Sequence, residues 1–112
     1  MRTLCRLEEI PDGAARGFGP APGGFTGLFG IRQGDAVHVY VNACPHVGVS
    51  LDWAPDQFLT ADGAQIVCAT HGALFDIETG RCTGGPCVGE HLERVPTTID
   101  QGQILVPDDA GL

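Results

Sequence analysis

Two short pairs of cysteine and histidine constrain the fold of this chain more than any other feature. One residue separates Cys44 from His46, two separate Cys68 from His71, and 21 residues lie between the pairs. Each pair supplies one thiolate and one imidazole from a short loop. A fold that uses both pairs for one metal site therefore has to bring two distant loops together.

The order of the ligands within each pair distinguishes two kinds of metal site. Zinc fingers pair two cysteines in one loop and two histidines in another, whereas each loop here mixes the two types. Two mixed loops can bind a two-iron, two-sulfide cluster. Both cysteine thiolates then bind one iron, and both histidine nitrogens bind the other. Neutral imidazoles remove negative charge from such a cluster and make its reduction easier. The pattern favours the cluster, with a structural zinc ion as the alternative.

The residues around both pairs resemble the Rieske [2Fe–2S] ferredoxins and domains. The two sequences read Cys44-Pro-His-Val-Gly48 and Cys68-Ala-Thr-His-Gly72, and a later Gly84-Gly-Pro86 resembles a third loop whose proline covers the cluster. The resemblance implies one [2Fe–2S] cluster per chain, bound by Cys44, His46, Cys68 and His71. It also implies three residues that surround the cluster without binding iron, namely Gly48, Gly72 and Pro86.

Length and composition predict one small all-β domain. The chain has 112 residues, with 17 glycines and eight prolines between short apolar runs. The resemblance implies an antiparallel β-sandwich base with an inserted cluster-binding subdomain at about residues 44–87. Residues 11–24 are expected to form a loop. Strands are expected near residues 3–7, 25–31, 36–42, 65–68, 74–77, 95–99 and 103–106.

Charge and hydropathy limit the partners and the location. Fourteen acidic residues against six basic ones exclude nucleic acid as a ligand. The acidic surface serves solubility or steers a redox partner, and four carboxylates lie near the ligand loops in sequence: Asp52, Asp56, Glu90 and Glu93. No segment has the ~18 apolar residues of a membrane span, and the N-terminus lacks a signal-peptide pattern. We expect a soluble, cytoplasmic monomer.

The sequence indicates electron transfer without catalysis by the chain itself. It contains no nucleophile motif and no phosphate-binding glycine loop before a helix. The resemblance implies a carrier that takes one electron from a flavin-dependent reductase and docks transiently with a terminal oxygenase. The alternatives are a Rieske-like small subunit of an assimilatory nitrite reductase and a zinc-stabilised interaction module.

Two departures from the family bear on the reduction potential. Respiratory-chain members carry an extra cysteine in each ligand loop, and the two form a disulfide; Val49 and Ala73 occupy the matching places here. High-potential members also have a hydroxyl near the position of Ala73, which donates to a sulfide. Its absence predicts a potential in the lower part of the Rieske range of about −150 to +300 mV.

Several residues fall outside this pattern. The gap between the pairs exceeds that expected of small Rieske ferredoxins, and the surplus is residues 52–59. Trp53 and Phe58 within it are predicted either to pack as local core or to form an aromatic lip beside the cluster. Cys82 and Cys87 are predicted to be buried thiols, or a disulfide in an oxidising compartment. The remaining expectations are a buried thiol at Cys5 and surface positions for His38 and His91.

Overall fold

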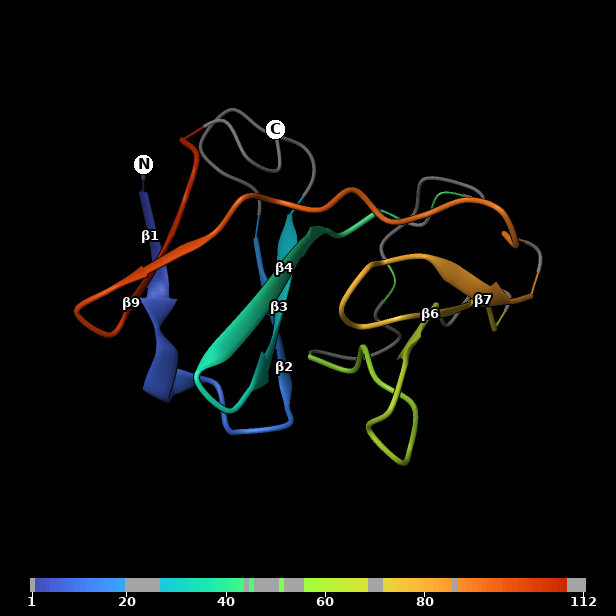
Figure 1. Cartoon of the computed structure of the whole chain (residues 1–112), viewed down its shortest axis with the longest axis horizontal. Coiled ribbons are helices and arrows are strands. Elements are labelled where there is room, and N and C mark those ends of the chain that lie inside the picture. Colours follow the sequence, from blue (N-terminus) through green and yellow to red (C-terminus); the bar gives the residue numbers. More distant parts are fainter. Residues whose placement is uncertain are drawn as a thin grey trace.

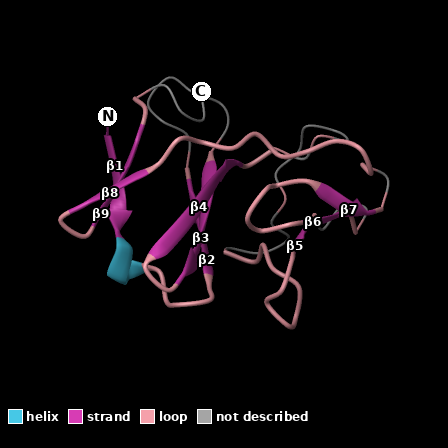
Figure 2. Cartoon of the chain, viewed as in Figure 1, coloured by secondary structure: helices cyan, strands magenta, loops and turns pink. Residues whose placement is uncertain are grey.

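The computed structural model describes residues 2–19, 27–43, 45, 51, 56–68, 72–85 and 87–108. These residues form three small antiparallel sheets and one short 3₁₀ turn, with strand orders β1-β9-β8, β2-β3-β4 and β5-β6-β7 (Figures 1 and 2). The elements are β1 (Arg2–Arg6), η1 (Leu7–Glu9), β2 (Ala15–Phe18), β3 (Leu28–Gln33), β4 (Ala36–Val41), β5 (Ile66–Val67), β6 (Leu74–Phe75), β7 (Cys82–Gly84), β8 (Thr98–Asp100) and β9 (Gln103–Val106). The all-β expectation is confirmed.

The sheet β2-β3-β4 lies in the middle and buries both of its faces. Along β4, Val37 and Val39 point into one core, while Tyr40 points into the other. The first core joins the middle sheet to β1 and β9 and contains Cys5, Ile10, Leu28, Val37, Val39, Val95, Ile104 and Val106. The second core joins it to β5-β6-β7 and contains Phe29, Ile31, Tyr40, Leu51, Phe58, Ile66, Cys68, Ala73, Phe75, Ile77, Cys82, Cys87 and Leu92. The valine alternation thus predicts the strand, but its second face is buried as well.

The expectation of a loop over residues 11–24 is wrong for residues 15–18, which form β2. Ala15 pairs with Ile31 and Phe18 with Leu28 along the edge of the middle sheet. Alanine and glycine are weak strand formers, so the local sequence Ala-Arg-Gly-Phe gives little signal. Pairing with the buried strand β3 decides the conformation instead, because β propensity depends strongly on the neighbouring strand.

The described part of the chain contains no helix with the length and apolar composition that a membrane span requires. The third sheet, β5-β6-β7, falls within residues 44–87, where the cluster-binding insertion is predicted.

Candidate metal centre

The loop that carries the first Cys-His pair leaves the end of β4. Its two ends are joined by a hydrogen bond in which the backbone N–H of Leu51 donates to Oδ1 of Asn42, at 2.8 Å. Leu51 is fully buried in the second core, so the returning end of the loop is anchored. Cys44 and His46 themselves lie outside the described residues, as does Gly48.

The second pair begins directly after β5, where Cys68 is fully buried. The N–H of Cys68 donates to the carbonyl of Ala73, and the N–H of Gly72 donates to the carbonyl of Cys68, both at 2.9 Å. Gly72 has a φ of +70°, in the left-handed region that favours glycine. These contacts join the two described ends of the segment between β5 and β6. His71 lies within it, outside the described residues.

The third loop follows β7 and packs against the second. Gly85 has a φ of +87°, and a Cβ placed there would lie 2.8 Å from the Cα of Ala73. Only glycine allows the two backbones to approach so closely. Pro86 lies outside the described residues, and after it Cys87 is buried while Val88 is 67% exposed.

The donor set fits an iron–sulfur cluster better than a carboxylate-rich metal site. The described residues hold no group of three or more metal-ligating side chains, because Cys68 alone of the four predicted ligands is among them. Cys68 is fully buried at the end of β5, and its backbone is bonded to Ala73, against which Gly85 of the third loop packs. Soft thiolate ligands in a water-poor setting suit iron–sulfur clusters. The assignment of the other three ligands stays a prediction.

The two histidines outside the motifs have different surroundings. His38 is half-buried, its Nδ1 accepts from Nη2 of Arg94 at 3.0 Å, and its Nε2 lies 3.1 Å from Oε1 of Gln33. Burial lowers the pKa of His38, and the charge of Arg94 lowers that pKa further. A neutral ring that accepts at Nδ1 and donates at Nε2 fits both contacts. His91 is exposed, and its Nδ1 lies 3.0 Å from the carbonyl of Leu92.

Part of the extension over residues 52–59 packs as core. Phe58 is fully buried, and its ring stacks on Phe29 with centroids 4.5 Å apart and planes 6° apart. Oδ1 of Asp56 accepts a 2.7 Å hydrogen bond from the N–H of Gly17 on the edge strand β2. The core prediction is therefore confirmed for Phe58, whereas Trp53 lies outside the described residues.

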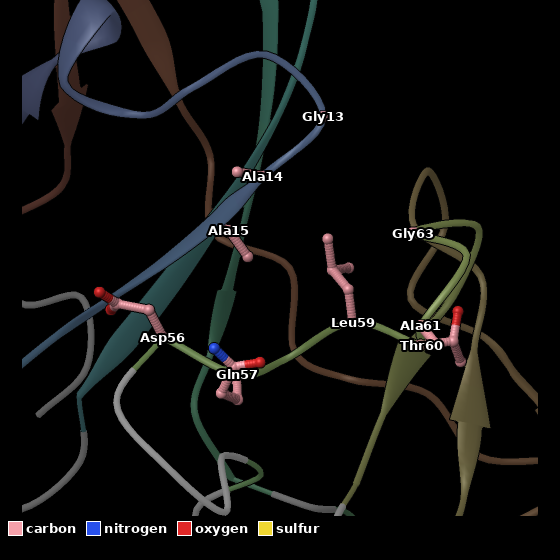
Figure 3. A pocket seen from close by; sticks show the side chains of 9 residues that line it. All are labelled: Gly13, Ala14, Ala15, Asp56, Gln57, Leu59, Thr60, Ala61 and Gly63. Atoms are coloured by element: carbon pink, nitrogen blue, oxygen red, sulfur yellow. The ribbon is translucent and has the colours of Figure 1, made fainter.

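An open cavity of about 410 Å³ separates β2 from the same segment. Figure 3 shows Ala15 and Leu59 on its opposite sides, with Asp56 and Gln57 at one end. Cys68 is not among its lining residues. The cavity is thus distinct from the loop that holds the one described candidate ligand.

The cysteines outside the motifs are buried. Cys82 is a free thiol whose Sγ donates to the carbonyl of Gly84 at 3.1 Å, and it forms no disulfide with the buried Cys87. Cys5 is also buried, and desolvation together with the nearby charge of Glu9 raises its pKa. These are the buried thiols that the sequence predicts. Of the four carboxylates near the loops, Asp56, Glu90 and Glu93 are exposed, and Asp52 lies outside the described residues.

Comparison with known proteins identifies the family. Residues 3–100 match the family model described as Rieske [2Fe-2S] domain. No curated protein sequence is similar enough to count as a relative. Among solved structures, the ferredoxin of carbazole 1,9a-dioxygenase from Nocardioides aromaticivorans IC177 is 28% identical, with 94% of each chain covered and a TM-score of 0.74.

Two further structures share the fold. The Sphingomonas yanoikuyae B1 ferredoxin is 27% identical over 94% of this chain and 95% of its own, with a TM-score of 0.73. A complex of reduced oxygenase and oxidized ferredoxin in carbazole 1,9a-dioxygenase contains a chain that is 24% identical, with 99% and 95% covered and a TM-score of 0.76. The family match favours the cluster over the structural zinc ion. The chain belongs to the Rieske [2Fe-2S] domain family, with one [2Fe–2S] cluster as its cofactor.

Proposed function

We propose that this chain is a ferredoxin-type electron carrier whose cluster is bound by Cys44, His46, Cys68 and His71. The observation that carries the proposal is the 28% identity to a Rieske ferredoxin over 94% of both chains, so the matched unit is a whole ferredoxin. The bound cluster would be held by the two thiolates and the two imidazoles, and it would supply a one-electron couple.

The chain's own residues would shape that couple in three ways. Burial of Cys68 keeps water from its thiolate. The close approach of Gly85 to Ala73 holds the third loop over the second, where Pro86 would cover the cluster. Gly48 and Gly72 would let the ligand loops turn tightly, and Gly72 has the positive φ that this role requires. We propose residues 44–87 as the cluster-binding subdomain of a single domain.

For partners, we propose a flavin-dependent reductase as electron donor and a terminal oxygenase as acceptor. The oxygenase is supported by two relatives: one is the ferredoxin of a dioxygenase, and the other forms a complex with its oxygenase. The exposed carboxylates Asp56, Glu90 and Glu93 would speed the encounter with a partner of positive charge. Transient docking of a monomer in the cytoplasm completes the proposal.

The test is electron paramagnetic resonance of the dithionite-reduced protein, with an iron assay alongside. We expect about two irons per chain and a rhombic signal with an average g value below that of all-cysteine clusters. His46→Ala and His71→Ala should each abolish the signal. Cys82→Ser is the matched control and should keep it, because Cys82 bonds to a backbone carbonyl and is not a proposed ligand. A normal signal in either histidine variant would refute the ligand assignment.

A further inference from the structure

The two Cys-His pairs follow strands of different sheets, so the distance between the pairs depends on how those sheets are held together. Cys44 follows β4 of the middle sheet, whereas Cys68 follows β5 of the third sheet. In Figure 1 the turn between β6 and β7 points toward β4. A cluster held from both sheets keeps its geometry only if the sheets stay at one distance, because metal ligands have to be placed within a fraction of an ångström.

A group of hydrogen bonds joins the two sheets at this turn. The hydroxyl of Tyr40 on β4 donates to the carbonyl of Ile77 at 2.5 Å. Nη1 of Arg94 donates to the carbonyl of Glu78 at 2.6 Å and to the Tyr40 hydroxyl oxygen at 3.0 Å. The guanidinium also lies 5.6 Å from the centre of the Tyr40 ring. We call these four residues the clamp.

The surroundings of Tyr40 keep the clamp in one arrangement. The side chain is fully buried, and burial raises its pKa, so the hydroxyl stays protonated and able to donate. A Cβ at Gly80 would lie 2.7 Å from the Tyr40 ring, so the turn fits against the ring only with glycine there. Apolar packing has no preferred direction, whereas these hydrogen bonds do. The clamp therefore fixes the register between the sheets as well as their contact.

We propose that Tyr40 and Arg94 are positioning residues for the cluster. They hold the turn after β6 against β4, and β6 pairs directly with β5, the strand that ends at Cys68. In this way they keep the loop of Cys44 and the loop of Cys68 at the separation that one cluster requires. The inference rests on the proposed ligand set.

The test compares Tyr40→Phe with Val39→Ala in the cluster-loaded protein. Tyr40→Phe removes only the hydroxyl, whereas Val39→Ala destabilises the opposite face of the same strand, in the first core. An iron chelator is added, and the loss of visible absorbance is followed. Since one lost hydrogen bond raises the population of a locally opened state about tenfold, iron loss should be about tenfold faster in Tyr40→Phe. Val39→Ala should lose iron at the wild-type rate although it melts at a lower temperature.

Two more readouts separate positioning from general stability. The reduced cluster of Tyr40→Phe should give broader resonance lines than those of Val39→Ala, because the two ligand pairs would sample a range of separations. Arg94→Ala should also speed iron loss, and the double variant should fall short of the product of the single effects, since both residues share the Tyr40 hydroxyl.

Each negative outcome has a separate meaning. A wild-type protein that binds no iron would overturn the ligand assignment and this inference with it. A wild-type protein that holds its cluster, but whose Tyr40→Phe and Val39→Ala variants lose iron at equal rates, would overturn the inference alone. Strictly multiplicative effects of Tyr40→Phe and Arg94→Ala would likewise show that the two residues do not act as one clamp.

Discussion

Replacing Gly85 with alanine should disturb the candidate metal centre far more than the same change at Gly89. Both glycines have a positive φ, +87° and +98°, so alanine costs about 1–2 kcal/mol of backbone strain at either position. A Cβ at Gly85 would also lie 2.8 Å from the Cα and 3.3 Å from the N of Ala73, whereas at Gly89 it meets no described atom within 4 Å. Forcing the two backbones apart adds about 1–3 kcal/mol at Gly85 alone.

Urea unfolding of the two cluster-loaded variants measures this difference. We expect a loss of about 2–5 kcal/mol for Gly85→Ala and about 1–2 kcal/mol for Gly89→Ala, each relative to the wild type. Because Ala73 directly follows the loop of Cys68, the iron content should fall in Gly85→Ala and stay at the wild-type level in Gly89→Ala. Equal losses of stability and full iron in both variants would show that the third loop does not hold the second, and the reasoning would fail.

Three further predictions address the core, the pH response and the potential. Phe58→Ala should lower the free energy of unfolding by about 3–5 kcal/mol, because the ring is fully buried against Phe29; a loss below about 1 kcal/mol in urea would contradict its core role. Burial and Arg94 lower the pKa of His38, so the unfolded state binds a proton at a higher pH than the folded state does, and the wild-type free energy of unfolding should fall as the pH drops from about 7.5 to 5.5. His38→Gln should lose less stability over this range. Parallel curves of stability against pH for the two proteins would refute the role given to His38. Ala73→Ser should raise the reduction potential by about 40 mV if its hydroxyl donates a bond that is about 1 kcal/mol stronger in the reduced state, and an unchanged potential in protein-film voltammetry would count against this.

Local sequence patterns were enough to predict the strands that are rich in β-branched residues and to recognise the family. The alternation of Val37, Val39 and Val41 predicts β4, and the hairpin that ends in β9 is evident from Gly102 between two apolar runs. The edge strand β2 could not be predicted in this way, because alanine and glycine have a low strand propensity.

The clamp could not be predicted from local patterns. Arg94 and Tyr40 are 54 residues apart, and neither belongs to a motif. A tyrosine on a strand and an arginine in a loop are common on protein surfaces. Here Tyr40 is fully buried, whereas Arg94 is exposed and reaches the Tyr40 hydroxyl from the surface. Long-range contacts of this kind become visible only once the sheets are packed. Gly80 gives one indirect sign, since a Cβ at this position would lie 2.7 Å from the Tyr40 ring.

The position of the two Cys-His pairs on separate sheets also explains why the segment between them can be long. Because the pairs leave separate sheets, the number of residues between them is free to vary as long as both ends are anchored. Closing a loop of twice the length costs only about 0.6 kcal/mol of chain entropy. Burying Phe58 against Phe29 contributes more than this, about 3–5 kcal/mol when judged by removal of such rings. The bond from Gly17 to Asp56 adds a further tie to β2, which offsets the strain of the φ of +63° at Asp56. Residues 56–59 therefore act as an added brace between the middle sheet and β5, alongside the clamp.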